Sequence, residues 1–142
     1  MSESNVYFLD ACALIALVKQ ESGAEVVEDL LVKALNDKKF IIQINKINLL
    51  EVYYGFHRER GKAFADEILR KIKDSAVGIT DTIYAVLAEA GRLKSIYRRI
   101  SLADAVALAE ASIAEGTIVT ADHHEMDTIE QSEPGIQFLW IR

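Results

Sequence analysis

The sequence is poor in cysteine and in long apolar runs, and both shortages restrict what the protein can be. Cys12 is the only cysteine, so no internal disulfide can form, as is usual in a reducing compartment. No apolar run reaches the ~18 residues that a membrane-spanning helix needs. The opening residues, MSESNVYF, also lack the basic stretch that begins a signal peptide. We therefore expect a cytoplasmic protein that has no membrane partner.

Positive charge is scarce as well. The chain has 16 lysines and arginines against 22 aspartates and glutamates, which gives a net charge of −6. A protein that holds nucleic acid on a broad basic surface has the opposite sign. An acidic protein can still act on phosphate esters when its carboxylates hold a divalent metal ion, because the ion then supplies the positive charge.

The 142 residues fit one domain of ordinary size, and we expect a single domain over residues 1–142. Short apolar runs predict strands, and between them lie segments with helical periodicity. This alternation predicts an α/β fold with three layers, in which helices cover both faces of a mainly parallel sheet of four or five strands. The expected strands are residues 6–9, 40–44, 77–79, 117–120 and 136–141. The expected helices are residues 11–18, 24–35, 49–60, 63–73 and 101–114. We also expect a long helix that Thr80 caps and that ends near residue 94, and a short helical turn at 123–129.

Acidic residues stand at four junctions between predicted strands and helices. Asp10 directly follows the first strand in VYFLDACALIAL, and Asp122 follows the fourth strand in TIVTADHHE. Glu51 and Asp104 lie near helix starts, in KINLLEVYYG and SLADAVALAEA. Parallel strands all end at one edge of the sheet, which is where α/β proteins bind ligands. We expect these four carboxylates to converge there.

Each carboxylate also has a simpler interpretation. Asp10 and Asp122 suit the N-cap position of a helix, and Asp104 forms a capping-box pattern with Ser101. Glu51 suits a solvated helix surface. Two further carboxylates also follow predicted strands and stay open as alternatives: Asp81 and Asp127.

A set of four close carboxylates has a specific chemistry. Like charges a few ångströms apart disfavour joint ionisation, so the set needs a compensating cation. Hard oxygen ligands suit Mg²⁺ or Mn²⁺. Such an ion binds phosphate oxygens and makes water a better nucleophile, which predicts hydrolysis of a phosphodiester.

Four segments that carry these acids occur in a characteristic order over nearly the whole chain: FLDACALIAL, INLLEVYYG, ISLADAVALAEA and TIVTAD. In this order they resemble PIN-domain ribonucleases, and among them the VapC-type toxins of toxin–antitoxin pairs. The resemblance implies an Mg²⁺- or Mn²⁺-dependent endoribonuclease with Asp10, Glu51, Asp104 and Asp122 as its catalytic and metal-binding acids. It also implies a PIN-like three-layer fold, an RNA substrate, a VapB-like protein antitoxin as partner, and a homodimer.

Two small residues near these acids bear on the resemblance. The family commonly has Ser or Thr shortly after its first Asp, where this chain has Cys12. A thiol is a weaker hydrogen-bonding group than a hydroxyl, so we expect Cys12 to act mainly as a small buried side chain. Thr120 matches the family's Thr before the fourth acid, and we expect it to orient a carboxylate or a metal-bound water.

Apolar helix faces give an independent reason to expect a homodimer, because they offer more apolar surface than one small sheet can cover. These faces are Val27, Leu30, Leu31 and Ala34 on one helix and Val52, Tyr53 and Phe56 on another. The neighbouring His123 and His124 do not have the spacing of structural zinc ligands. A contact between His123 and substrate stays open.

The alternative function is a non-catalytic or phospho-accepting α/β binding module with an acidic metal site. A phosphatase of the haloacid-dehalogenase type has a second Asp where this chain has Cys12. A phospho-accepting receiver domain has an acidic pair near its first strand and a Lys after its last active-site strand, and this chain has Asp10 alone and no Lys following Asp122. The set of four acids favours the enzyme.

Overall fold

The computed structural model of the chain describes residues 5–142. Residues 1–4, the first half of the opening stretch MSESNVYF, lie outside this part. The described residues form five strands and seven helices. The strands are β1 (Val6–Leu9), β2 (Ile41–Asn45), β3 (Gly78–Thr80), β4 (Thr117–Thr120) and β5 (Gln137–Trp140). The helices are α1 (Ala11–Lys19), α2 (Ala24–Asn36), α3 (Lys46–Arg60), α4 (Lys62–Lys73), α5 (Tyr84–Ile96), α6 (Leu102–Ile113) and α7 (His123–Ser132).

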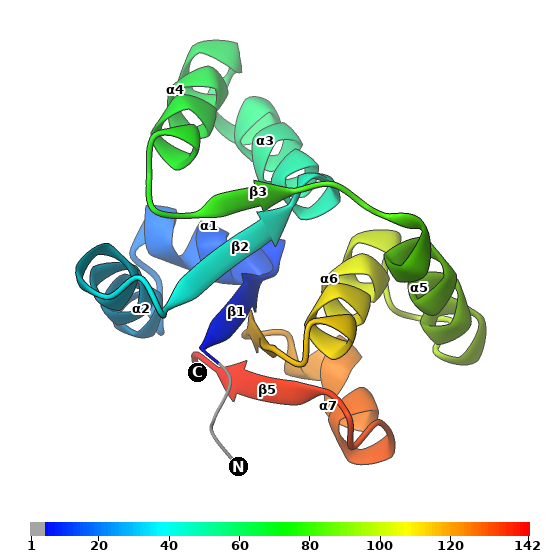
Figure 1. The fold of residues 1–142 in the computed structure, drawn as a ribbon. Helices are drawn as coiled ribbons and strands as arrows, with labels where there is room; N and C mark the ends of the chain where they lie inside the picture. The colour runs from blue at the N-terminus through cyan, green and yellow to red at the C-terminus, as the bar shows by residue number, and fades with distance from the viewer. Residues whose placement is uncertain (1–4) are drawn as a thin grey trace.

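The five strands form one sheet in the order β3-β2-β1-β4-β5, and every neighbouring pair is parallel (Figure 1). In β1, Tyr7 lies opposite Ile42 of β2 on one side and Thr117 of β4 on the other. The chain moves outward from β1 to β3 and then returns to add β4 and β5 on the opposite side. The predicted parallel α/β sheet is confirmed, and its order reverses between β1 and β4.

Helices cover both faces of the sheet, as predicted (Figure 1). Successive strand side chains point to opposite faces, so neighbours in β1 and in β4 enter different cores. Leu9 and Val119 pack with Ile44 against α1 to α4. Phe8 and Ile118 pack against α5, α6 and α7. Because both faces are buried, β1 is apolar along its whole length, and the middle of β4 is Ile118 and Val119.

The start of α5 differs from the prediction. Thr80 does not cap this helix: it is the last residue of β3 and lies opposite Asn45 in the sheet. Its hydroxyl donates a hydrogen bond of 2.7 Å to Oε2 of Glu110, a buried carboxylate on α6. Helix α5 begins at Tyr84, and its N-cap residue Ile83 forms no side-chain cap. Strand pairing and a buried acceptor together explain why Thr80 is extended.

Two other helices are longer than predicted. Helix α3 begins at Lys46 because Asn45 caps it, with Oδ1 accepting the Ile47 N–H at 2.9 Å. The predicted turn after Asp122 is a helix of 10 residues that continues to Ser132. No helix in the described part of the chain is both long enough and apolar enough to cross a membrane.

The apolar helix faces proposed as dimer surface lie mostly in the core. Val27, Leu30, Val52 and Phe56 are each at most 5% exposed. The other members of these faces, Leu31, Ala34 and Tyr53, are partly buried and pack against the same core. The argument that these faces remain uncovered is therefore wrong, because four helices pack together on this side of the sheet and cover them.

Candidate active site

The fold brings the four predicted acids to the carboxyl edge of the sheet. Asp10 follows the end of β1 and Asp122 lies two residues beyond β4, so both stand where the strand order reverses. Glu51 lies on α3, the helix that follows β2. Asp104 lies in the first turn of α6, whose other end leads into β4. The N-terminal end of α6 is therefore at the same edge, which is the usual ligand-binding position in such sheets.

An open pocket of about 270 Å³ occupies this edge. Its lining residues are Cys12, Glu51, Arg99, Ser101, Asp104, Asp122 and Glu125. Asp10 is only 1% exposed and lies behind this wall. It still interacts electrostatically with the pocket residues, because the charges of Asp104 and Asp122 both raise the pKa of Asp10. The structure thus brings all four predicted acids together, three on the surface of the pocket and one beneath it.

Asp10 combines the two roles that its position in the sequence suggests. Its backbone N–H continues the ladder to β4 by donating to the Val119 carbonyl at 3.2 Å. Its Oδ1 caps α1 by accepting the Ala13 N–H at 2.8 Å. Within residues 5–142, the buried Oδ2 has no hydrogen-bond partner. One oxygen therefore serves the helix, and the other is a buried acceptor without a partner in the described part of the chain.

Burial raises the pKa of Asp10 to about 7, and repulsion by Asp104 and Asp122 adds to this. Hydrogen bonds from the Thr120 side chain and the Ala13 N–H act in the opposite direction and are outweighed. A carboxyl group with so high a pKa is unstable as an anion in its own protein. Within the described part of the chain, no positively charged side chain is among the groups that shift the pKa of Asp10.

Asp104 and Glu51 are shifted in the same direction. Burial raises the pKa of Asp104 to about 6, helped by the charges of Asp122 and Glu51 and opposed by hydrogen bonds with Ser101. Burial and the charge of Asp122 also raise the pKa of Glu51. Burial and the charges of neighbouring carboxylates thus disfavour the anionic forms of Asp10, Asp104 and Glu51, and a bound cation would offset this.

Thr120 connects the two acids at the ends of β1 and β4. It is fully buried, and its hydroxyl accepts the Asp122 N–H at 3.0 Å while lowering the pKa of Asp10. Cys12 lies in the pocket wall and is half-buried. Burial and the charge of Asp10 raise the pKa of its thiol to about 11, so Cys12 is neutral near pH 7 and is a poor nucleophile.

The sequence analysis missed Glu125, which lines the pocket together with Arg99. The Glu125 N–H donates to Oδ1 of Asp122 at 3.2 Å, and in the described part of the chain its buried Oε2 has no partner. Glu125 follows Asp122 by three residues on α7, and this helical spacing was the signal that would have found it. Arg99 lies in the loop before α6, where no periodic pattern marks it.

Asp81 and Asp127, the two alternative carboxylates, lie outside the pocket. Asp81 forms an exposed ion pair of 2.7 Å with Lys46, at the end of β3. Asp127 faces the other side of α7, where its Oδ1 lies 2.7 Å from Nδ1 of His123. Both are therefore held by partners away from the four acids.

His123 has a structural position. Its Nε2 lies 2.8 Å from the carbonyl oxygen of Arg142, and its ring stacks on Trp140 with 3.8 Å between centroids. Hydrogen bonding with Asp127 and with the Arg142 carbonyl raises its pKa. These contacts tie the start of α7 to β5 and the end of the described chain, and they occupy the atoms that a substrate would contact.

The donor set fits a divalent cation that keeps part of its hydration shell. Across residues 5–142, no three His, Cys, Asp or Glu side chains stand close enough to form a complete ligand set by themselves. Mg²⁺ does not need one, since it is usually held by one or two carboxylates together with waters and substrate phosphates. The unpartnered buried oxygens of Asp10 and Glu125 are hard donors of the kind that it binds.

Comparison with known proteins places this arrangement in a family. No curated protein matches the chain. Solved structures that share its fold include DNA-bound VapBC of Salmonella typhimurium (TM-score 0.73, 15% identity, 100% of both chains) and VapBC-1 of nontypeable Haemophilus influenzae (0.68, 20%, 96% of this chain and 98% of that one). A third is VapC20 of Mycobacterium tuberculosis, described as a sarcin–ricin loop cleaving toxin (0.67, 13%, 86% and 94%). Residues 7–130 match the PIN domain, a span that runs from β1 into α7 and holds all five acids of the site, and the chain therefore belongs to the PIN-domain family.

Proposed function

We propose that this protein is a metal-dependent endoribonuclease that hydrolyses RNA phosphodiester bonds, and that it is the toxin of a VapBC-type toxin–antitoxin pair. One observation carries the proposal: the carboxyl-edge pocket gathers acids, and burial and the charges of neighbouring acids raise the pKa values of Asp10, Asp104 and Glu51. A site of this kind suits a divalent ion and, through it, an anionic phosphodiester.

Each residue has a role in this proposal. Asp10, Glu51, Asp104 and Asp122 would hold Mg²⁺ or Mn²⁺, which when bound neutralises phosphate oxygens and lowers the pKa of a coordinated water. Thr120 fixes the backbone of Asp122 through its hydrogen bond and keeps Asp10 and Asp122 in register. Ser101 fixes Asp104 by accepting its N–H at 3.0 Å at the start of α6. These hydrogen bonds fix the backbone of Asp104 and Asp122 before any ligand arrives.

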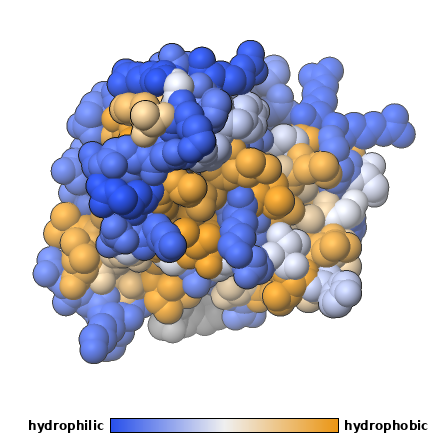
Figure 2. All heavy atoms as spheres, turned by 90° about the horizontal axis from the view of Figure 1, so that it is seen from above, coloured by the Kyte–Doolittle hydropathy of each residue, from blue (hydrophilic) through white to orange (hydrophobic). Residues whose placement is uncertain are grey.

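The structural neighbours support the proposed RNA substrate and partner. Two of them are VapBC proteins, and the third is named for cleavage of the sarcin–ricin loop, an RNA segment. We infer a VapB-like antitoxin for this chain by the same likeness. A surface that could bind it is the face seen from above, where apolar side chains lie exposed among hydrophilic ones (Figure 2). On α3, Ile47, Leu50 and Tyr54 are 39%, 56% and 49% exposed.

The burial of Asp10 argues against a phospho-accepting module. A phosphoryl acceptor must present its carboxylate to a phosphate donor, and Asp10 is 1% exposed. Its capping bond to Ala13 and its position behind the pocket wall leave no route for attack on a bulky donor.

The lack of a disulfide partner for Cys12 is consistent with the cytoplasm, where the RNA substrate is found.

Metal dependence tests the proposal. Purified protein should cleave single-stranded or loop RNA in Mg²⁺ or Mn²⁺, lose this activity in excess EDTA, and regain it when the ion is added back. The variant Asp81→Asn, whose carboxylate is exposed and paired with Lys46 at the same edge of the sheet, should behave as wild type and serves as the matched control. Cleavage that persists in EDTA would refute the proposed mechanism.

A further inference from the structure

A second hollow adjoins the acidic pocket and has a different charge. It has a volume of about 350 Å³ and is lined by Ile96, Tyr97, Arg98, Arg99, Ile100, His124, Glu125 and Thr128. Arg99 and Glu125 line both hollows, so the two hollows are neighbours. One side of the acidic pocket thus opens onto a surface that carries two arginines.

The two arginines are free to bind an external anion. Both are exposed, and within residues 5–142 neither forms an ion pair or a side-chain hydrogen bond. Arg99 lines a pocket that contains Glu51, Asp104, Asp122 and Glu125, yet it comes within ion-pair distance of none of them.

The loop that carries them is fixed from below. Lys94, in the last turn of α5, donates through Nζ to the carbonyl oxygens of Arg98 at 2.7 Å and of Ile100 at 2.6 Å. Ile100 is 1% exposed and anchors the loop in the core. The backbone on both sides of Arg99 is therefore held, while the side chains of Arg98 and Arg99 point into solvent.

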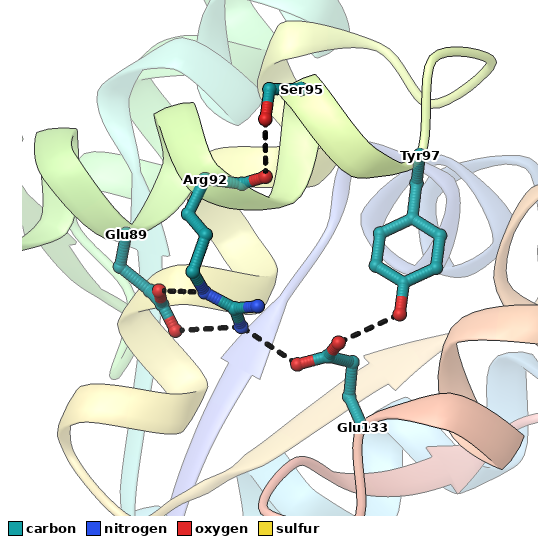
Figure 3. Close-up of polar contacts among 5 residues, drawn as sticks. All are labelled: Glu89, Arg92, Ser95, Tyr97 and Glu133. Atoms are coloured by element: carbon teal, nitrogen blue, oxygen red, sulfur yellow. Dashed lines mark hydrogen bonds and ion pairs between the residues drawn. The ribbon is translucent and has the colours of Figure 1, made fainter.

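A network of polar contacts fixes the start of the same loop (Figure 3). The Tyr97 hydroxyl donates to Oε2 of Glu133 at 2.7 Å. Arg92 donates to Oε1 of Glu133 at 2.7 Å and to Glu89 at 2.6 Å, as the dashed lines in Figure 3 mark. The network joins α5 to the end of α7. It therefore sets the width of the second hollow, whose walls come from the loop and from α7.

We propose that Arg98 and Arg99 bind phosphates of the RNA strand next to the bond that is cleaved, and so position the strand across the acidic pocket. This inference rests on the proposed ribonuclease function. The acidic pocket repels a polyanion everywhere except at the bound cation, so the strand requires positive charge close by. Contacts of this kind fix position and register without reading sequence. The arginines are positioning residues and do not take part in the chemical step.

The position of Arg99 favours RNA over an acidic protein segment as the ligand. Arg99 lies in the walls of both hollows, and any strand with a phosphate in the acidic pocket must place its next phosphates against one of the adjoining walls. The wall that Arg98 and Arg99 form is the one with unpaired positive charge.

The test compares Arg98→Ala/Arg99→Ala with Lys38→Ala/Lys39→Ala. The control removes the same charge from two exposed lysines in the turn before β2, at the opposite edge of the sheet. Neither double variant should change the melting temperature, because none of these side chains packs in the core. With a single-stranded RNA oligonucleotide in Mn²⁺, the arginine variant should raise KM and leave kcat within about threefold of wild type.

Salt dependence gives a readout that a structural defect would not imitate. Each phosphate contact on a single strand contributes a slope of about −0.7 to log K against log salt, so losing two should flatten the slope by about 1.4. The affinity loss should then be about 25-fold at 0.1 M salt and vanish near 1 M. The same slope difference should appear in oligonucleotide binding in EDTA, and the lysine control should keep the wild-type slope.

Three results would overturn the inference. The first is that the arginine variant keeps the wild-type KM and the wild-type salt slope while wild type cleaves RNA. This result would refute the role of the arginines and leave the ribonuclease function intact. The second is loss of binding to polyglutamate without loss of binding to RNA, which would assign the arginines to an acidic protein partner. The third is absence of RNA cleavage by wild type in any divalent metal, which would overturn the proposed function itself.

Discussion

Replacing Asp10 with Asn tests whether this residue belongs to a charged cluster or only caps a helix. Asn caps helices about as well as Asp, so the bond to the Ala13 N–H is retained. What the variant loses is a buried negative charge next to Asp104 and Asp122. If Asp10 were only a cap, metal ions would affect the stability of both proteins equally.

The magnitude follows from the pKa. Burial raises the pKa of Asp10 from 3.8 to about 7, so between these values the native state binds more protons than the unfolded state. The free energy of unfolding of wild type therefore falls as the pH rises through this range, and it falls by about 4 kcal/mol at 1.36 kcal/mol per pKa unit. The contribution is present below pH 3.8 and is lost above pH 7. The Asn variant has no such proton to lose.

Urea unfolding in EDTA between pH 4 and pH 8, followed by circular dichroism, measures this difference. The two proteins should have similar free energies of unfolding at pH 4, and the variant should be the more stable at pH 8. Adding Mg²⁺ or Mn²⁺ at pH 8 should stabilise wild type by roughly 2.7 kcal/mol at a hundredfold excess over Kd, and the variant much less. Asp81→Asn, which removes an exposed carboxylate, should follow wild type throughout. Parallel pH and metal profiles for wild type and Asp10→Asn would refute the cluster.

Two further predictions concern Cys12 and the oligomeric state. Cys12→Ser should keep RNA cleavage within a few-fold, because the thiol is neutral near pH 7 and Ser is the commoner family residue; a hundredfold loss would give the thiol a specific role. Static light scattering at micromolar concentration should find a homodimer, since Tyr84 and Leu87 of α5 are 90% and 58% exposed and form an apolar surface that a second copy can cover. A monomer would contradict this expectation.

The order of elements and the meeting of the acids were both predictable, for the same reason. An apolar run ending in Asp10 predicts a buried strand and a helix start, and parallel strands bring all such junctions to one edge. Local pattern was enough for Asp10, Glu51, Asp104 and Asp122, because their positions depend on topology. The N-cap interpretation of Asp10 and Asp122 was also right, since both roles need the same place at the helix start.

Features set by tertiary contacts were not predictable. Thr is a common N-cap residue, but the Thr80 hydroxyl donates a hydrogen bond to the buried Glu110, which lies 30 residues further along the chain. The apolar faces with Val27 and Phe56 looked uncovered because the sequence does not reveal that helices α1 to α4 pack on the same side of the sheet. Arg99 enters the site through a loop whose shape depends on Lys94, and no periodicity encodes such a contact.

The central claim is that the carboxylates of the pocket, with a divalent ion, cleave RNA. Cleavage of a single-stranded RNA in Mn²⁺ by identically purified wild type, Asp104→Asn and Asp81→Asn tests it most directly, because the two variants remove one carboxylate each from the same edge of the sheet. Asp104→Asn removes a pocket carboxylate, so its cleavage rate should fall at least about a hundredfold, as expected for a group that acts in the transition state. Asp81→Asn removes an exposed carboxylate outside the pocket and should cleave RNA at the wild-type rate. Equal rates for wild type and Asp104→Asn would contradict the account.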